Sequence, residues 1–237
     1  MNAFDAGILH FLNQFAGKSW LLDKAVGFIR GSTLHGPIFM AAMWWAWFRP
    51  GENQRRDREF ILSGLATTFG ALFFARALAD LLPFRARPFE VASLNLRLPF
   101  GGDSASLIHW SSFPSDHAVF YFSLATSIFF VSRRLGVAAY LYTFLFICMP
   151  ILYRGQHYPT DVLAGTAIGI GAAFLSVNAK LREWIAQRPL RRLENSPGII
   201  YAVFFLVSFL FSMQFDPLRD TAYSAWSTAR YLIHGQH

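Results

Sequence analysis

The sequence predicts an all-α protein: a polytopic membrane helix bundle with about six transmembrane helices and one N-terminal interfacial helix. The 237 residues are 54% hydrophobic and only 15% charged, whereas about 25% of a soluble domain is charged. Five apolar runs, and a sixth that is richer in glycine and alanine, provide the spans. We expect one domain over 1–237, with an interfacial segment at 1–33, a transmembrane core at 34–215 and a tail at 216–237.

The N-terminal segment and the apolar runs can be justified in chain order. Large apolar residues recur at helical spacing over residues 4–15, so we expect an amphipathic helix that lies on the membrane. The spans are expected at 34–48, 60–75, 118–131, 137–152, 162–177 and 199–215. The fifth of these carries Gly165, Gly169 and Gly171, a small-residue face that lets helices approach closely.

Basic residues lie in three clusters between the apolar runs, at 49–58, 133–134 and 180–192. An even number of spans separates each cluster from the others, so all three share one face. The positive-inside rule makes that face cytoplasmic. A formal charge of +7 placed in this way is typical of membrane-protein loops, and we expect no nucleic-acid partner.

Three polar segments emerge on the opposite, exterior face. "LPFRARPF" follows the second span, "SSFPSDHA" precedes the third, and "YRGQHYPTD" joins the fourth span to the fifth. Ionisable groups at a membrane boundary are costly, and they usually mark a functional site. Because the three segments share a face, we expect them to meet in one pocket.

The composition of this pocket predicts phosphate as its ligand. Pro114 and Pro159 stand where helices can begin, and two helix N-termini would then point free N–H groups at one anion. Arginine forks match phosphate oxygens in pairs, and a serine hydroxyl adds a further contact. The candidate phosphate-binding residues are Arg85, Arg87, Ser115 and Arg154.

Two histidines in these segments are the candidate reacting groups. His157 precedes Asp161 by four residues, so the carboxylate can hold one ring nitrogen and leave the other able to attack phosphorus. His117 can protonate the departing oxygen. A zinc site built from the same three residues is the alternative, but neighbouring arginines repel a cation and no fourth ligand is evident. We therefore expect no metal and no cofactor.

Short motifs at these positions resemble those of the type 2 phosphatidic acid phosphatase superfamily. "PSDH" at 114–117 is similar to the second motif of that family, "HYPTD" at 157–161 to the end of the third, and Arg87-Pro88 to the end of the first. The set looks most like the bacterial branch that removes phosphate from undecaprenyl diphosphate. The resemblance implies a metal-independent phosphatase with His157 as nucleophile, Asp161 as its orienting residue and His117 as acid.

The resemblance also implies the setting of the protein. We expect an integral multi-pass protein of a bacterial inner membrane, with its site on the periplasmic or exterior face. The expected partners are the bilayer and a phosphate-bearing membrane lipid, with a polyprenyl diphosphate favoured as substrate.

Two cations of the family pattern are missing from their usual places. Asp80 stands where the first motif begins with lysine, and Pro150 and Ile151 stand where the third begins with serine and arginine. These departures leave two alternatives to a lipid phosphatase. One is an impaired family member that binds phospholipid, and the other is a lipid phosphotransferase.

Overall fold

The computed structural model describes residues 2–101 and 110–213, and within them it holds helices and no strands. The all-α prediction is therefore confirmed for this part of the chain, whereas the expected tail at 216–237 lies outside the described residues. The α-helices are α1 (Ala3–Asn13), α2 (Trp20–Arg30), α3 (His35–Phe48), α4 (Gln54–Leu81), α5 (Asp116–Val131), α6 (Arg133–Tyr142), α7 (Met149–Tyr153), α8 (Pro159–Phe174), α9 (Ala179–Asn195) and α10 (Pro197–Ser212).

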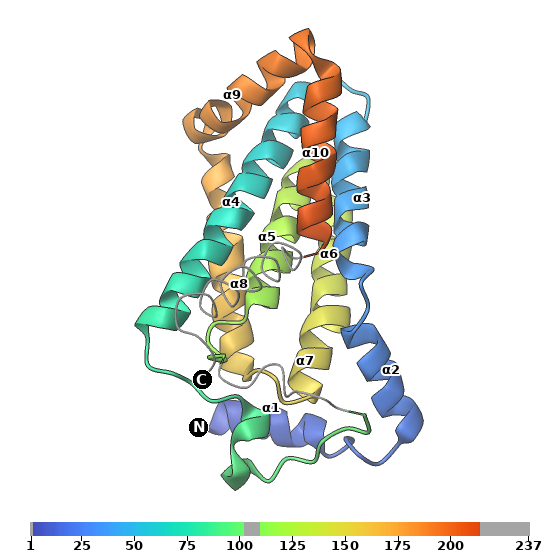
Figure 1. The fold of residues 1–237 in the computed structure, drawn as a ribbon, viewed down its shortest axis with the longest axis vertical. Coiled ribbons are helices and arrows are strands. Elements are labelled where there is room, and N and C mark those ends of the chain that lie inside the picture. The colour runs from blue at the N-terminus through green and yellow to red at the C-terminus, as the bar shows by residue number, and fades with distance from the viewer. Residues whose placement is uncertain (1, 102–109, 214–237) are drawn as a thin grey trace, which may run out of the picture.

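The bundle is formed by α3, α4, α5, α6, α8 and α10, and α1 lies across its lower end (Figure 1). A π-helical turn at Thr143–Cys148 joins α6 to α7 without a break in the rod. Two short 3₁₀ helices, η1 (Pro88–Glu90) and η2 (Ala92–Leu94), lie in the connection between α4 and α5. A third, η5 (Leu175–Val177), continues α8.

Within the described residues, helical segments occupy each of the six expected spans, the last of them as far as Ser212. Three of them are long and apolar enough to cross a membrane, namely Gln54–Leu81, Arg133–Tyr153 and Pro159–Val177. The apolar helices α5 and α10 are shorter than a full span, and α3 has 14 residues. Three candidate spans are thus present in the described residues, and the count of six stays a prediction.

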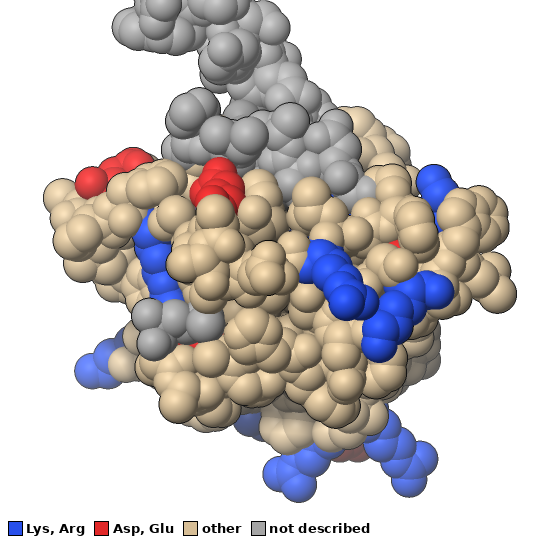
Figure 2. All heavy atoms as spheres, turned by 90° about the horizontal axis from the view of Figure 1, so that it is seen from below, with Lys and Arg blue, Asp and Glu red and all other residues tan. Residues whose placement is uncertain are grey.

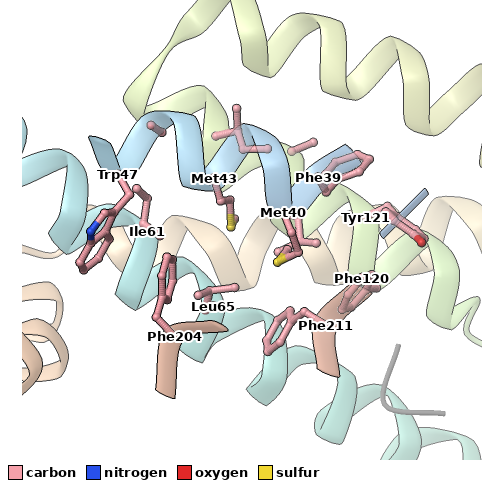
Figure 3. Packing of buried hydrophobic residues seen from close by; sticks show 14 of the residues in the cluster. Phe39, Met40, Met43, Trp47, Ile61, Leu65, Phe120, Tyr121, Phe204 and Phe211 are labelled. Atoms are coloured by element: carbon pink, nitrogen blue, oxygen red, sulfur yellow. The ribbon is translucent and has the colours of Figure 1, made fainter. Parts of the chain in front are cut away.

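The core lies between α3, α4, α5 and α10 (Figure 3). Trp47 of α3 is fully buried and stacks on Phe204 of α10 with ring centroids 4.8 Å apart. Phe39 lies on the same helix and packs against Tyr121 of α5 at 5.0 Å. Inside a bilayer such contacts act through van der Waals packing, because lipid tails are as apolar as the side chains.

Glycine sets the distance between α5 and α8. A Cβ added to Gly165 would lie 2.5 Å from the carbonyl oxygen of Ser115, and one added to Gly169 would clash with that of Val119. Nothing lies within 4 Å of the same position on Gly171. Two of the three glycines predicted to allow close approach therefore do so, which brings the beginnings of α5 and α8 together.

The three basic clusters share the end of the bundle opposite α1 (Figure 1). Arg49 reaches the carbonyl of Val131, next to the second cluster, at 3.4 Å. Arg182 of α9 pairs with Glu59 of α4 at 3.4 Å. The prediction that the clusters lie on one face is confirmed, whereas the helical state of α9 was not among the sequence-based expectations.

The N-terminal segment forms two helices, α1 and α2, where one was expected. Asp23 of α2 is buried and accepts hydrogen bonds from the backbone N–H groups of Gly17 and Phe100, at 3.0 and 2.9 Å. It also accepts one from the hydroxyl of Tyr153 at the end of α7. Seen from below, the surface at this end is mainly uncharged, with scattered Lys and Arg side chains (Figure 2).

Candidate active site

The three polar segments meet at the lower end of the bundle, where α5 and α8 begin. The amide of Ser115 donates to the carbonyl of Asp161 at 3.2 Å, which ties the two helix N-termini together. Ser112 N–H donates to the carbonyl of Arg85 at 2.9 Å, and Phe89 N–H to that of Gly155 at 3.0 Å. Backbone hydrogen bonds therefore join each segment to another, as the parity of the spans predicts.

Helix starts at this end match the prolines only in part. Pro159 is the first residue of α8, with Tyr158 as its N-cap. The other helix, α5, begins at Asp116, two residues after Pro114, and Ser115 is its N-cap. Both N-termini point toward the same region, and each contributes the positive end of a helix dipole.

The hydrogen bonds of His157 define its tautomer. Its Nδ1 lies 2.7 Å from the carbonyl oxygen of Ser112, and its Nε2 lies 3.2 Å from Nη1 of Arg87. A carbonyl can only accept, so Nδ1 carries the proton, and a guanidinium can only donate, so Nε2 carries the lone pair. Both contacts point to one tautomer, with the unprotonated nitrogen beside a fixed positive charge.

The pKa of His157 is lowered from its ordinary value of 6.5, mainly by burial. Asp161 opposes this shift, and the positive charge of Arg87 adds to it. The imidazole is therefore neutral at pH 7, which is the form that has a lone pair to share.

Arg87 is held in the centre of the site. It is 5% exposed and donates to the carbonyls of Trp110 and Gln156, at 3.2 and 2.8 Å, besides its contact with His157. Burial is the main cause that lowers its pKa, to about 10, so the guanidinium remains charged at pH 7. The structure thus places Arg87 where an arginine can hold a phosphate next to the imidazole.

Asp161 is fully buried near His157. Its Oδ2 accepts from the amide of Tyr158 at 2.8 Å and lies 3.7 Å from Nδ1 of His157, beyond hydrogen-bond distance. The direct partner of that nitrogen is therefore the Ser112 carbonyl, and the carboxylate acts on the ring through its charge. A backbone carbonyl carries no signature in the sequence, so this partner could not be predicted.

Arg85 is engaged by two carboxylates. It forms ion pairs with Asp161 and, at 3.0 Å, with Asp5 of α1. Its guanidinium also donates to the hydroxyl of Thr160 at 3.0 Å and lies over the ring of Tyr158, 4.0 Å from the centroid. The structure therefore places Arg85 in the support of the site, with its charge balanced by protein groups.

Ser115 lies at the N-cap of α5 with its side chain buried. Its Oγ has no hydrogen-bond partner among the described residues, and neither has the Oγ of Ser112. Buried hydroxyls are seldom left unsatisfied in folded proteins. A hydroxyl in this state beside two helix N-termini fits the predicted contact with a bound anion.

His117, in the first turn of α5, lines a cavity of about 160 Å³. The lining of the cavity also includes Arg30 and Thr33, which are polar, and Phe146 and Met213, which are apolar. His117 and His157 thus lie at the beginnings of two helices that are tied together through Ser115 and Asp161.

Arg154 is the C-cap residue of α7, and its predicted role in phosphate binding stays a prediction. A Cβ added to Gly27 of α2 would lie 3.5 Å from Nη1 of Arg154. This arginine therefore packs against the N-terminal segment, whereas Arg87 approaches His157 directly.

Asp5, Arg30 and Gln156 are among the residues at the site that were absent from the sequence-based predictions. The Gln156 side chain accepts from Nε of Arg30 at 2.9 Å, while its backbone carbonyl accepts from Arg87. These contacts depend on how α1 and α2 dock, which the amphipathic pattern of the N-terminal segment does not specify.

A zinc site was the alternative reading of the two histidines and Asp161. In the part of the chain that the structure describes, no three His, Cys, Asp or Glu residues are grouped to hold a metal ion.

Comparison with known proteins adds independent information. Residues 60–185, just over half of the chain, match the PAP2 superfamily model. The chain is 26% identical over 123 residues to undecaprenyl-diphosphatase BcrC of Bacillus subtilis (strain 168), a match that covers 52% of this chain and 58% of the relative. It is 37% identical over 65 residues to the bacitracin transport permease protein BcrC of Bacillus licheniformis, covering 27% and 30%. No solved structure matches the chain significantly.

The chain thus matches less than two thirds of the length of either relative. The matched family region contains the segments that carry Arg87, His117 and His157. The resemblance seen in the short motifs is confirmed: the chain belongs to the PAP2 superfamily.

Proposed function

We propose that the protein is a metal-independent membrane phosphatase that hydrolyses a phosphate monoester or diphosphate on a lipid through a phosphohistidine on His157. A polyprenyl diphosphate, such as undecaprenyl diphosphate, is the favoured substrate. One observation carries the proposal: the lone pair of His157 is directed toward Arg87 while Ser112 holds the opposite nitrogen. Membership of the PAP2 superfamily and the similarity to an undecaprenyl-diphosphatase support it.

In the first step Nε2 of His157 attacks phosphorus. The N–P bond forms as the P–O bond to the leaving group breaks. Burial and neighbouring positive charges lower the pKa of His117 well below 6.5, so the proton that it passes to the departing oxygen arrives with the bound substrate phosphate. The Nδ1–H of His157 remains bonded to the Ser112 carbonyl, so the ring keeps its orientation as it becomes positively charged. Asp161, 3.7 Å from that nitrogen, stabilises the charge.

In the second step water attacks the phosphohistidine. His117, now neutral, accepts a proton from the water, the P–N bond breaks, and inorganic phosphate leaves with His157 restored. Arg87 and the N-termini of α5 and α8 stabilise the charge that develops on the phosphoryl oxygens in both steps. Ser115 supplies the buried hydroxyl.

The proposed site lies at the end of the bundle opposite the three basic clusters. Because basic loops favour the cytoplasmic side, this arrangement supports a site on the exterior face of a bacterial inner membrane.

The impaired phospholipid-binding protein is the second candidate. The observation that favours it is the environment of the two departures: Ile151 is fully buried and Asp80 is exposed, so neither supplies a charge to the site. A phosphotransferase would differ only in using a hydroxyl instead of water in the second step.

Phosphate release from purified protein in detergent micelles tests the proposal. The substrates are a panel of lipid monophosphates and diphosphates, and the variant is His157→Ala beside His10→Ala, an exposed histidine of α1. We expect the wild type and His10→Ala to release phosphate, and His157→Ala to lose at least about 10⁴-fold in rate while its melting temperature is retained. Turnover by His157→Ala would refute the phosphohistidine, and an inactive wild type would favour the binding protein.

A further inference from the structure

Two arginines from distant parts of the chain are joined through Gln156. Arg30, the last residue of α2, donates from Nε to the Gln156 side chain at 2.9 Å, and Arg87 donates from Nη1 to its backbone carbonyl at 2.8 Å. One residue therefore contacts both guanidinium groups, one through its side chain and the other through its backbone. Arg30 lies outside the region that matches the family model.

Each of the two arginines is associated with a different histidine. Arg87 contacts the nucleophilic nitrogen of His157. Arg30 lines the cavity of about 160 Å³ together with His117. The site thus has two halves, one with a nucleophile and a cation, the other with an acid and a cation.

The cavity has the composition expected around a lipid headgroup. Its lining includes the polar residues Arg30, Ser32 and Thr33 and the apolar residues Phe146, Ile147 and Met213. A charged group bound by Arg30 would have apolar walls beside it, suited to the first carbons of a hydrocarbon chain.

Electrostatics point to a ligand with two negative centres. Burial is the main cause that lowers the pKa of Arg87. The positive charges of Arg76 and, to a smaller extent, Arg30 lower it further, whereas Glu90 and Asp161 raise it. Two like charges in a partly buried site repel each other, and an anion that spans both would relieve this repulsion. Two linked phosphoryl groups meet that requirement better than one.

We infer that Arg30 is a substrate-binding residue that holds the phosphate on the leaving side of a lipid diphosphate, while Arg87 holds the phosphate that is transferred. This inference rests on the proposed function. It lets the N-terminal segment supply one of the two positive charges that are missing from the family pattern.

The chemical step is then a displacement at the terminal phosphorus. The bond from that phosphorus to the bridging oxygen breaks, and the bridging oxygen receives the His117 proton. It leaves as part of a lipid monophosphate that Arg30 retains through paired N–H···O bonds. The terminal phosphoryl group remains on His157 beside Arg87.

The test compares Arg30→Gln and Arg30→Lys with Arg134→Gln, which removes one exposed charge at the opposite end of the bundle. Steady-state hydrolysis of a polyprenyl diphosphate is measured in micelles. Inhibition is measured separately with polyprenyl monophosphate, which reports on the leaving side, and with orthovanadate, which mimics the transferred phosphoryl group.

For Arg30→Gln we expect KM for the diphosphate and the inhibition constant of the monophosphate to rise about 30-fold, with vanadate inhibition changed less than about 3-fold. Arg30→Lys should fall between this variant and the wild type, because it keeps the charge and loses the fork. Arg134→Gln should match the wild type.

The outcomes separate this inference from the proposed function. If Arg30→Gln binds monophosphate as the wild type does, or loses monophosphate and vanadate equally, the assignment of Arg30 is overturned while the phosphohistidine stands. If the wild type releases no phosphate, the proposed function itself fails.

Discussion

Arg85 bridges Asp5 and the site, because its Nη2 lies 3.0 Å from Oδ2 of Asp5 and its Nη1 pairs with Asp161. Asp5 is fully buried and also accepts from the amide and the hydroxyl of Thr160, at 2.9 and 2.8 Å. It therefore caps the first turn of α8 from a helix 155 residues earlier in the chain. The position of Asp161 near His157 depends in part on α1.

Replacing Asp5 with Asn should weaken this support. The amide would turn N–H donors toward Arg85, and the loss of one partner from a largely buried ion pair costs roughly 2 kcal/mol after allowance for the part of Arg85 that is exposed. We expect the melting temperature in detergent to fall by about 4–8 °C, and kcat to fall more than KM rises. Glu52→Gln, an exposed change at the other end, should alter neither, and equal behaviour of the two variants would contradict the role of Asp5.

The pH dependence should reflect the lowered pKa of His157. Protonation removes the lone pair, and because burial and Arg87 lower this pKa from 6.5, the neutral form persists to more acidic pH than in an unperturbed histidine. Activity should therefore be retained as pH falls to 6.5 and decline only below it. The measurement is kcat/KM against pH, corrected for ionisation of the substrate phosphate, and an acid limb centred above 6.5 would contradict the assignment.

His117→Ala should discriminate between leaving groups. A lipid alkoxide or phosphate leaves slowly without a proton, and general acids contribute about 10²- to 10⁴-fold. A nitrophenolate needs no such help. We expect a loss of at least about 100-fold on a lipid phosphate and under about 10-fold on p-nitrophenyl phosphate. Equal losses on both substrates would show that His117 is not the acid.

Gly165→Ala should separate the two helix beginnings. The new Cβ would meet the Ser115 carbonyl at 2.5 Å, and such overpacking costs about 1–3 kcal/mol. We expect a melting temperature about 5–10 °C lower and a large loss of activity, since the contact between α5 and α8 aligns the two histidines. Gly171→Ala, which meets nothing within 4 Å, is the matched control and should be neutral or slightly stabilising.

Activity should also survive a chelator. Each role in the proposed reaction belongs to a side chain or to a helix N-terminus, so EDTA at millimolar concentration should leave the rate of phosphate release unchanged. Loss of activity in EDTA, restored by a divalent cation, would argue for metal chemistry in place of the phosphohistidine.

The sequence predicted the parts of the site that follow from span parity and local motifs. Successive connections between spans alternate between the two faces of the membrane. Counting the spans between Arg87, His157 and Asp161 therefore placed all three on one face. Gly165 and Gly169 were predictable for the same reason, since small residues on one face of an apolar helix indicate close packing.

The parts that depend on tertiary docking were not predictable. Asp5 and Arg30 reach the site only because α1 and α2 turn back beneath the bundle. The spacing of these residues in the sequence does not indicate this docking. Arg85 and Arg87 look equivalent as "RAR", yet one is neutralised by carboxylates and the other contacts His157. Local sequence cannot decide which of two alternate residues will meet an acidic partner from α1.

Through Asp23, a single buried carboxylate, the hairpin of α1 and α2 is fastened to Phe100 and to Tyr153. This clasp holds Asp5 and Arg30, both outside the matched family region, in contact with Thr160 and Gln156, which lie inside it. If Arg30 binds substrate as inferred, a different N-terminal hairpin would change the lipid contact and leave His117 and His157 in place. A fragment limited to residues 60–185 would keep His117 and His157 and would lose Asp5, Asp23 and Arg30.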